Sequence, residues 1–318
     1  MSIHRFNIKL LNYDAWGDDA GFERTKNAWI EAEQLLSNVN YSTHHGLIDI
    51  HVNWTSAING LSSFSRTEAK PQATIKVHKK MKNEAARNIA RSCLELYLSN
   101  YFMIMNLAVP GVCNFYNTEI ISSRESNRSK IELDCYQIEA AIKFSREIGW
   151  PIIKDIEMSR VYTWLKALKI GTRQVASSRI ERVLFAFLNA LHGDATITNI
   201  LWLSHALECF YDTPSIEIVK HLRNRSFKWL PVPENNKKVI KKVFDNFYAI
   251  RSAYVHGTLE IVHPSSNEVI DEEVNTYLGK IYDANSFGLA MLLASIQSLI
   301  VSGYHELIFD EVIQGKTI

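Results

Sequence analysis

The segment FGLAMLLASIQSLIV, residues 287–301, is the most apolar stretch of the chain. Its apolar residues cover nearly every side of a helix, and a helix of that kind is stable in water only when it is buried. The segment is shorter than the roughly 20 residues that a helix needs to cross a bilayer. Ser295, Gln297 and Ser298 also interrupt it. We therefore expect a central helix buried inside a soluble protein, with no contact to a membrane.

Helical periodicity extends from about residue 78 towards the C-terminus and places this segment among other helices. Short connections that contain glycine or proline separate the candidate helices, as in a helical bundle. An acidic loop through Pro264 and Asn267 precedes a final pair of helices. The expected helices span residues 79–105, 134–147, 154–168, 177–192, 196–211, 215–230 and 236–256, and the final pair spans 272–309.

The N-terminal residues have a mixed pattern. Apolar and polar residues alternate over 3–11 and 46–54, which predicts strands, whereas 22–36 has helical spacing. Two polar segments, 62–72 and 122–130, are expected to be connections without regular structure.

These patterns predict a mainly α fold, with an α+β N-terminal region that carries a few strands and a C-terminal helical bundle. A boundary near residues 170–178 would divide the chain into domains 1–174 and 175–318. The role of the first domain does not follow from its residues.

Composition is typical of a globular protein. Of the 318 residues 47% are hydrophobic and the net charge is +1, so the chain can bury a substantial core and is no polycation. From Glu260 to the end there are nine acidic residues and two lysines. The rest of the chain is therefore net basic, which leaves room for a polyanionic partner.

Cysteine usage and the N-terminus predict a cytoplasmic location. The four cysteines are scattered without a C-x-x-C pair, as in reduced proteins. The segment MSIHRFNIKLLNYD lacks the apolar core of a signal peptide. No phosphate-loop, dinucleotide or zinc motif is present, so we expect no cofactor and no metal. His44, His45 and His51, with Asp49 near, could form a metal site, but surface histidines on a strand explain them better.

The candidate helix at 236–256 carries an arginine among its apolar residues. Arg251 follows Phe244 by seven residues and falls about 20° from it on a helical wheel. A guanidinium there needs a carboxylate or an anionic ligand. Glu208, alone in the apolar run WLSHALECFY, has the complementary need, so a buried Arg251–Glu208 pair would satisfy both. The expected core face of this helix comprises Val239, Ile240, Val243, Phe244, Phe247, Ile250 and Tyr254.

His256 lies in the last turn of the same helix, before Gly257. Imidazole can take a proton from a ribose 2′-hydroxyl or give one to a leaving oxygen, and a nearby arginine can stabilise a phosphate. The alternative is that the two residues have no catalytic role: the arginine packs against the core, and the histidine only ends the helix. This alternative applies to most Arg-x4-His matches. On an ideal helix Arg251 and His256 point about 140° apart. The two side chains can therefore act on one substrate only if the last turn of the helix is loosened or if the site spans two subunits.

Three motifs in succession give this region a resemblance to the ApeA-like HEPN family. They are ALECF at 206–210, RSFKWL at 225–230 and YAIRSAYVHG at 248–257. Their order, spacing and expected placement on helices agree with that family over roughly residues 177–303. The resemblance implies a helical bundle that pairs with a second copy and, in many members, acts as an endoribonuclease in antiphage defence or as a toxin.

What the resemblance implies for single residues follows by position. Arg251 and His256 would be catalytic in a metal-independent cleavage of single-stranded RNA or tRNA, at the cleft of a homodimer, with a regulatory protein or a phage component as trigger. Ser252, Glu208 and Tyr248 would support the catalytic residues. Arg223 and Arg225 would contact the RNA, although Arg225 could instead have a structural role. Some family members are instead non-catalytic modules that bind nucleic acid, a nucleotide or a protein, and a plain scaffold in a larger defence complex is a third hypothesis.

Overall fold

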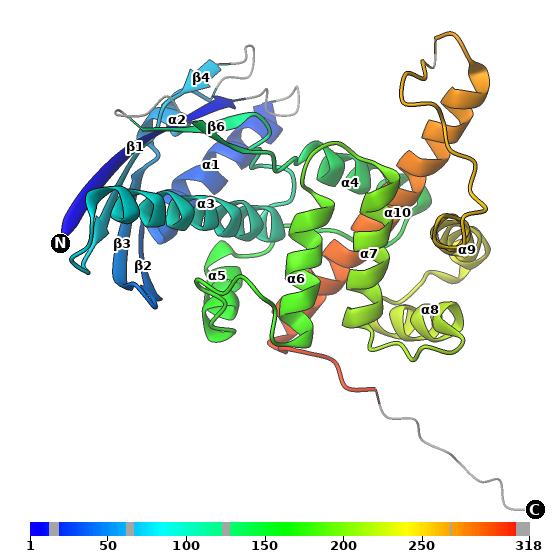
Figure 1. Cartoon of the computed structure of the whole chain (residues 1–318). Coiled ribbons are helices and arrows are strands. Elements are labelled where there is room, and N and C mark those ends of the chain that lie inside the picture. The colour runs from blue at the N-terminus through cyan, green and yellow to red at the C-terminus, as the bar shows by residue number, and fades with distance from the viewer. Residues whose placement is uncertain (13–18, 62–66, 123–127, 268, 310–318) are drawn as a thin grey trace, which may run out of the picture.

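The computed structural model describes residues 1–12, 19–61, 67–122, 128–267 and 269–309. A strand-rich N-terminal part is followed by a mostly helical C-terminal part, and 56% of the chain is helical. Figure 1 shows the sheet on one side of the molecule and the helices α6 to α10 on the other, with α3 reaching from the sheet towards the bundle. The mainly α fold with an α+β N-terminal region is thereby confirmed.

The N-terminal part is built on an antiparallel sheet with β1 near its middle. The strand order is β2-β3-β5-β1-β6-β7, and β4 pairs with the far end of β1. Side chains alternate along β1: Phe6 and Ile8 are buried, whereas Arg5 and Asn7 are exposed. One face of the sheet is therefore the core face. The strands are β1 (Ser2–Asn12), β2 (Asn38–Thr43), β3 (Gly46–Asn53), β4 (Thr67–Ala69), β5 (Gln72–Val77), β6 (Thr118–Ser122) and β7 (Arg128–Ile131).

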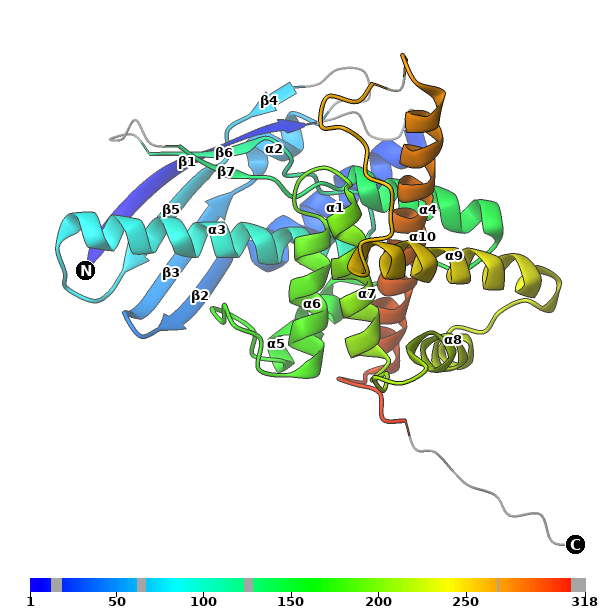
Figure 2. The same ribbon diagram turned by 45° about the vertical axis from the view of Figure 1, so that its right-hand side comes forward.

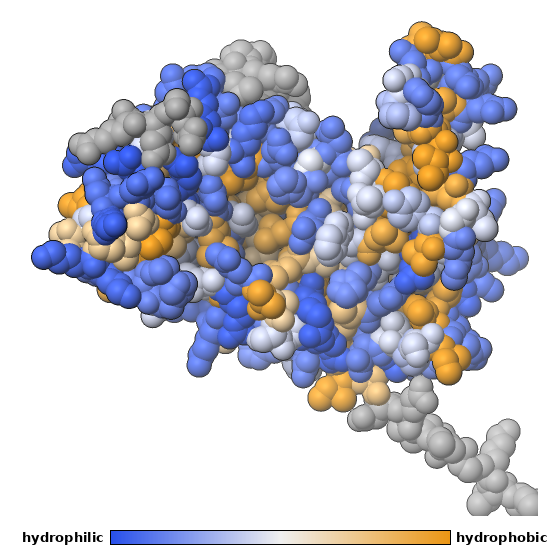
Figure 3. Space-filling model, viewed as in Figure 1, coloured by the Kyte–Doolittle hydropathy of each residue, from blue (hydrophilic) through white to orange (hydrophobic). Residues whose placement is uncertain are grey.

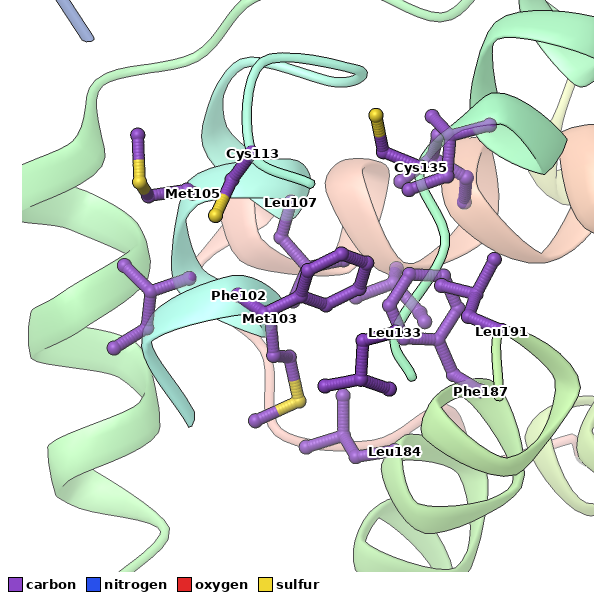
Figure 4. Packing of buried hydrophobic residues seen from close by; sticks show 14 of the residues in the cluster. Phe102, Met103, Met105, Leu107, Cys113, Leu133, Cys135, Leu184, Phe187 and Leu191 are labelled. Carbon is purple, nitrogen blue, oxygen red and sulfur yellow. The ribbon is translucent and has the colours of Figure 1, made fainter. Parts of the chain in front are cut away.

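Three helices belong to the sheet part: α1 (Asp19–Leu36), α2 (Thr55–Asn59) and α3 (Asn83–Ala108). The last eight residues of α3, 101–108, are all buried, because this end of the helix lies between the sheet and the bundle. Figure 4 shows Phe102 and Met103 of α3 close to Leu184 and Phe187 of a bundle helix. The strand-rich and helical parts therefore share one continuous apolar core.

The helical part is organised around α10, which packs against α4, α7 and α9. Two polar residues of α10 have partners inside the core. The Gln297 amide donates to the carbonyls of Leu107 (2.9 Å) and Lys154 (2.7 Å). The hydroxyls of Ser295 and Tyr211 lie 2.6 Å apart. The helices of this part are α4 (Tyr136–Ile148), α5 (Met158–Ala167), α6 (Arg179–Ala190), α7 (Ile197–Phe210), α8 (Ile218–Trp229), α9 (Lys237–Val255) and α10 (Glu272–Ser302).

The expected pair of helices over 272–309 is wrong, because a single helix of 31 residues, α10, occupies this segment. It ends where Gly303 takes a left-handed conformation (φ 72°), and residues 304–309 continue without a helix. At this length α10 is long and apolar enough to cross a membrane, whereas the apolar segment 287–301 alone was judged too short to do so. However, 89% of its most apolar window is buried inside the molecule, as in the core helix of a soluble protein.

Two segments expected to be irregular contain strands. The polar segment 62–72 includes β4, and 122–130 includes the ends of β6 and β7; residues 62–66 and 123–127 lie outside the described part. These strands are short, and β4 and β7 are largely polar, so they lack a long alternating pattern. After residue 177 no strand is present among the described residues apart from an isolated bridge between His192 and Leu133.

The crossing of α10 with α7 and α9 predicts opposite effects for two glycines of α10. A Cβ at Gly288 would lie 2.7 Å from the ring of Phe247 and 3.3 Å from Leu203, whereas a Cβ at Gly279 has no neighbour within 4 Å. We expect Gly288→Ala to lower the free energy of unfolding by roughly 1–3 kcal/mol through overpacking. Gly279→Ala should raise it by up to about 1 kcal/mol, because alanine favours the helix. Urea denaturation of both variants checks this, and a Gly288→Ala protein as stable as the wild type would contradict the tight crossing.

Candidate active site

Helix α9 is positioned by the aromatic residues on its inner face. Phe244 and Phe247 are buried, and each ring lies 5.9 Å from the ring of Phe287 on α10. Figure 2 shows α9 running across α10 and α7. Val239, which the sequence pattern placed on the core face, is 53% exposed, so the buried stripe begins at Ile240.

Glu208, Tyr248 and Arg251 form a cluster between α7 and α9. Both contacts converge on the same carboxylate oxygen, Oε1 of Glu208: the Tyr248 hydroxyl donates to it over 3.4 Å, and Nη2 of Arg251 lies 3.4 Å from it. The Arg251–Glu208 pair expected from the sequence is therefore present. Tyr248 and Arg251 are three residues apart on α9, which puts them on neighbouring positions of one face.

The electrostatics of the cluster are those of a partly desolvated ion pair. Burial raises the pKa of the Glu208 carboxyl, while the Arg251 guanidinium and the Tyr248 hydroxyl act in the opposite direction. Burial, and after it the nearby Glu208 carboxylate, raises the pKa of the Tyr248 phenol well above its usual value. Tyr248 thus stays a neutral hydrogen-bond donor, and of these two groups Arg251 favours the ionised carboxylate more strongly.

The Arg251 guanidinium is not fully used by this pair. Its side chain is 26% exposed, and its buried Nε has no hydrogen-bond partner among the described residues. Glu208 fixes one branch of the guanidinium group, so the exposed part can meet a further anion with its orientation already set.

His256 and Ser252 lie on the exposed side of the end of α9. The N–H of His256 donates to the carbonyl of Ser252 (3.0 Å), which continues the helical pattern. The N–H of Thr258 then donates to the carbonyl of Ala253 (2.8 Å) around Gly257, whose φ is 69°. This is a regular Schellman ending. Because the last turn is not loosened, it does not bring His256 to the same face as Arg251.

The two proposed RNA contacts on α8 have protein partners. Arg223 forms an ion pair with Asp245 of α9 (2.7 Å). Arg225 donates to the carbonyls of Tyr211 (2.9 Å) and Asp212 at the end of α7, and its guanidinium lies 4.6 Å from the centre of the Phe309 ring. These contacts favour the structural alternative for Arg225. The structure does not bring it into the Glu208–Arg251 cluster.

The histidines near β3 do not gather. The Asp49 carboxylate pairs with His78 (2.7 Å), His51 contacts Asn38 (2.9 Å), and His44 and His45 lie next to each other in the turn after β2. Among the described residues no group of three or more His, Cys, Asp or Glu side chains could hold a metal ion.

No family model, no curated protein and no solved structure matched the chain in the comparisons with known proteins. The resemblance in the motifs of α7, α8 and α9 therefore stands on those residues alone.

A second group of titratable side chains, at the start of α4, gave no motif in the sequence. Burial raises the pKa of Asp134 to about 6 and that of Glu139 to about 7. Asp134 borders a small cavity of about 210 Å³ together with Asn285 of α10. Sequence reasoning missed these residues because only tertiary burial distinguishes them from surface carboxylates.

Glu139 gives a prediction for the pH dependence of stability. A folded-state pKa of about 7 lies above the unfolded value near 4.3, so the protonated carboxyl stabilises the fold at acid pH. That contribution is lost as the pH rises through 7. We expect Glu139→Gln to match the wild type near pH 4.5 and to exceed its free energy of unfolding by roughly 1–3 kcal/mol at pH 8. Urea denaturation at the two pH values measures this, and an equal difference at both would refute the buried carboxyl.

Proposed function

We propose that this chain is an endoribonuclease that cuts single-stranded RNA or tRNA without a metal cofactor, with Arg251 and His256 as its catalytic residues. One observation carries the proposal: a partly exposed guanidinium is held by Glu208 and lies on the same helix as an exposed histidine. The motifs of α7, α8 and α9 support RNA as the substrate by their resemblance to HEPN ribonucleases. Antiphage defence or growth arrest is the role that fits such an activity.

The chemistry follows from the two side chains. Neutral His256 removes the proton of the ribose 2′-hydroxyl, and the 2′ oxygen attacks the adjacent phosphorus. The bond to the 5′ oxygen breaks, and that oxygen takes a proton from the solvent. The products are a 2′,3′-cyclic phosphate and a 5′-hydroxyl end. Arg251 stabilises the negative charge on the phosphate oxygens, while Glu208 and Tyr248 position the guanidinium and do not touch the substrate.

The site is proposed to form between two subunits. Arg251 and His256 are about 7.5 Å apart along the helix axis and face different directions, because α9 is regular to its end. A two-fold dimer brings Arg251 of each protomer towards the His256 of its partner, and two-fold pairing is the commonest assembly of identical chains. Glu208, which binds Arg251, would then complete the same composite site.

An apolar surface beside His256 supports pairing through this end of α9. Figure 3 shows apolar side chains on the arm that projects from the molecule, which includes residues 258–267, 269–271 and the first turns of α10. Val255, Ile261 and Ile270 are 51%, 77% and 84% exposed. Exposed apolar residues near a polar site are compatible with an interface between proteins.

The chemistry predicts RNA cleavage that continues in EDTA and depends on His256. His256→Ala should reduce the cleavage rate by about 10²–10⁴-fold, because it removes the proton acceptor, and should remain folded because the side chain is exposed. His305→Ala, which removes an exposed histidine beyond the other end of α10, is the matched control and should cut normally. Gel assays with an RNA and with the same strand carrying 2′-H at the cleaved position measure both effects.

Two outcomes would contradict the mechanism: cleavage of the 2′-H strand, or a strict requirement for a divalent ion. If the purified protein cuts no RNA, even with cell extract or phage components as activators, the non-catalytic binding module becomes the better description.

Pairing through the projecting arm predicts that a charge there separates the subunits. Ile261→Glu should convert the protein from dimer to monomer at micromolar concentration and reduce RNA cleavage in parallel, because a buried charge disfavours the interface. Ile152→Glu is the matched control, since Ile152 is 81% exposed on a different part of the surface. Light scattering gives the mass of each variant. A wild-type monomer that cuts RNA would disprove the two-subunit site.

Mixing two inactive variants tests the composite site itself. A heterodimer of Arg251→Ala and His256→Ala chains contains one intact site, so an equilibrated equimolar mixture should recover about a quarter of the wild-type activity. If each site lay within one subunit, the mixture would stay inactive.

A further inference from the structure

A cavity of about 820 Å³ lies between β2, α3, α5 and the loop that follows α5. It belongs to the part of the chain for which the sequence indicated no role, and neither Arg251 nor His256 borders it. Its volume falls in the range of roughly 300–1,000 Å³ that is usual for sites of small molecules. Six of its wall residues carry the argument: Tyr41, Tyr97, Tyr101, Tyr162, Lys166 and Lys169.

Four tyrosines border the cavity. The hydroxyls of Tyr41 and Tyr97 are used within the protein: Asn100 donates to the first (3.1 Å), and the second donates to the carbonyl of Leu36 (3.0 Å). The Tyr101 ring is stacked on Trp54, with 4.5 Å between ring centres. The aromatic wall is therefore held rigidly, which suits a planar ligand.

The hydroxyl of Tyr101 differs from the other two. The residue is 1% exposed, and its oxygen has no hydrogen-bond partner among the described residues. A buried hydroxyl without a partner is unfavourable, and a ligand that supplies one removes that cost. Because Tyr101 borders the cavity, a ligand group that reaches this oxygen would supply the missing partner.

All the charged residues that border the cavity are positive. Lys166, Lys169 and Arg173 border it, and no aspartate or glutamate does. Glu181 already pairs with Arg173 (2.5 Å), whereas neither lysine has an ion pair among the described residues. Lys169 itself adopts a left-handed conformation (φ 54°) in the loop after α5. Two unneutralised ammonium groups at the edge of an aromatic cavity call for an anionic group on the ligand.

We propose that this cavity binds a nucleoside phosphate, with the base among the tyrosines and the phosphate groups at Lys166 and Lys169. The Tyr101 hydroxyl and Oδ1 of Asn100 supply hydrogen bonds for the base or the ribose, since the NH₂ group of Asn100 already donates to Tyr41 and Gly171. A peptide added to the free edge of β2 is the competing occupant, but it would use neither the two lysines nor the buried hydroxyl. The proposal goes beyond the ribonuclease activity and does not depend on it.

Calorimetric titration of the full-length protein with ATP, GTP, CTP and UTP tests the proposal. The salt concentration is about 150 mM, close to the physiological ionic strength. We expect at least one nucleotide to bind more tightly than both of its halves, the nucleoside alone and tripolyphosphate alone. Lys166→Glu combined with Lys169→Glu should weaken that binding by about tenfold or more through loss of charge-assisted contacts. Lys143→Glu, at an exposed lysine on α4, is the matched control and should leave the affinity unchanged.

Tyr101→Phe tests the cavity without changing a charge. The ring and its stacking remain, so the melting temperature should stay the same or rise, while affinity falls by about threefold to tenfold. Absence of binding by all four nucleotides up to about 1 mM would overturn the proposal. Binding that survives both the lysine and the tyrosine substitutions, or a site filled by an extended peptide instead, would overturn it equally.

Discussion

The two hydrogen bonds of the Gln297 amide join α10 to the end of α3 and to the segment before α5. They satisfy the donors of a fully buried amide and two backbone carbonyls at once, so that this part of the helix can lie in the apolar core. With α10 fixed there, α4, α7 and α9 have a common surface to pack on. The placement of every residue of the candidate active site follows from that arrangement.

The Glu208–Arg251 contact links this core to the proposed active site. Removing the guanidinium would leave a carboxylate that burial already disfavours, and removing the carboxylate would leave a cation beside the apolar face of α9. The pair therefore has a structural role in addition to the catalytic role proposed for Arg251. For this reason the activity of an Arg251 variant has to be interpreted together with its stability. His256 is exposed, so a substitution there tests the proposed activity without affecting stability.

Sequence patterns predicted the parts of the fold that have long, regular periodicity. The strands β1 and β3, the helices α3 to α9 and the burial of 287–301 were all readable, as was the partner of Arg251, because two charges isolated in apolar runs require each other. Short strands such as β4 and β7 were missed because they depend on pairing with distant residues. The expected pair of helices over 272–309 was wrong because one helix continues without interruption as far as Gly303. The tyrosine-lined cavity gave no signal, since its walls come from segments far apart in sequence.

For the two-subunit site proposed above, the regular ending of α9 has a kinetic consequence. A catalytic centre that no single chain can complete has a rate that rises with the square of protein concentration while monomers predominate. Newly made chains would then be harmless to the RNA around them at low abundance, and cutting would begin steeply once synthesis crosses the association threshold. The concentration of the protein alone would thus limit its activity, because the last turn of α9 directs His256 away from Arg251 of the same chain.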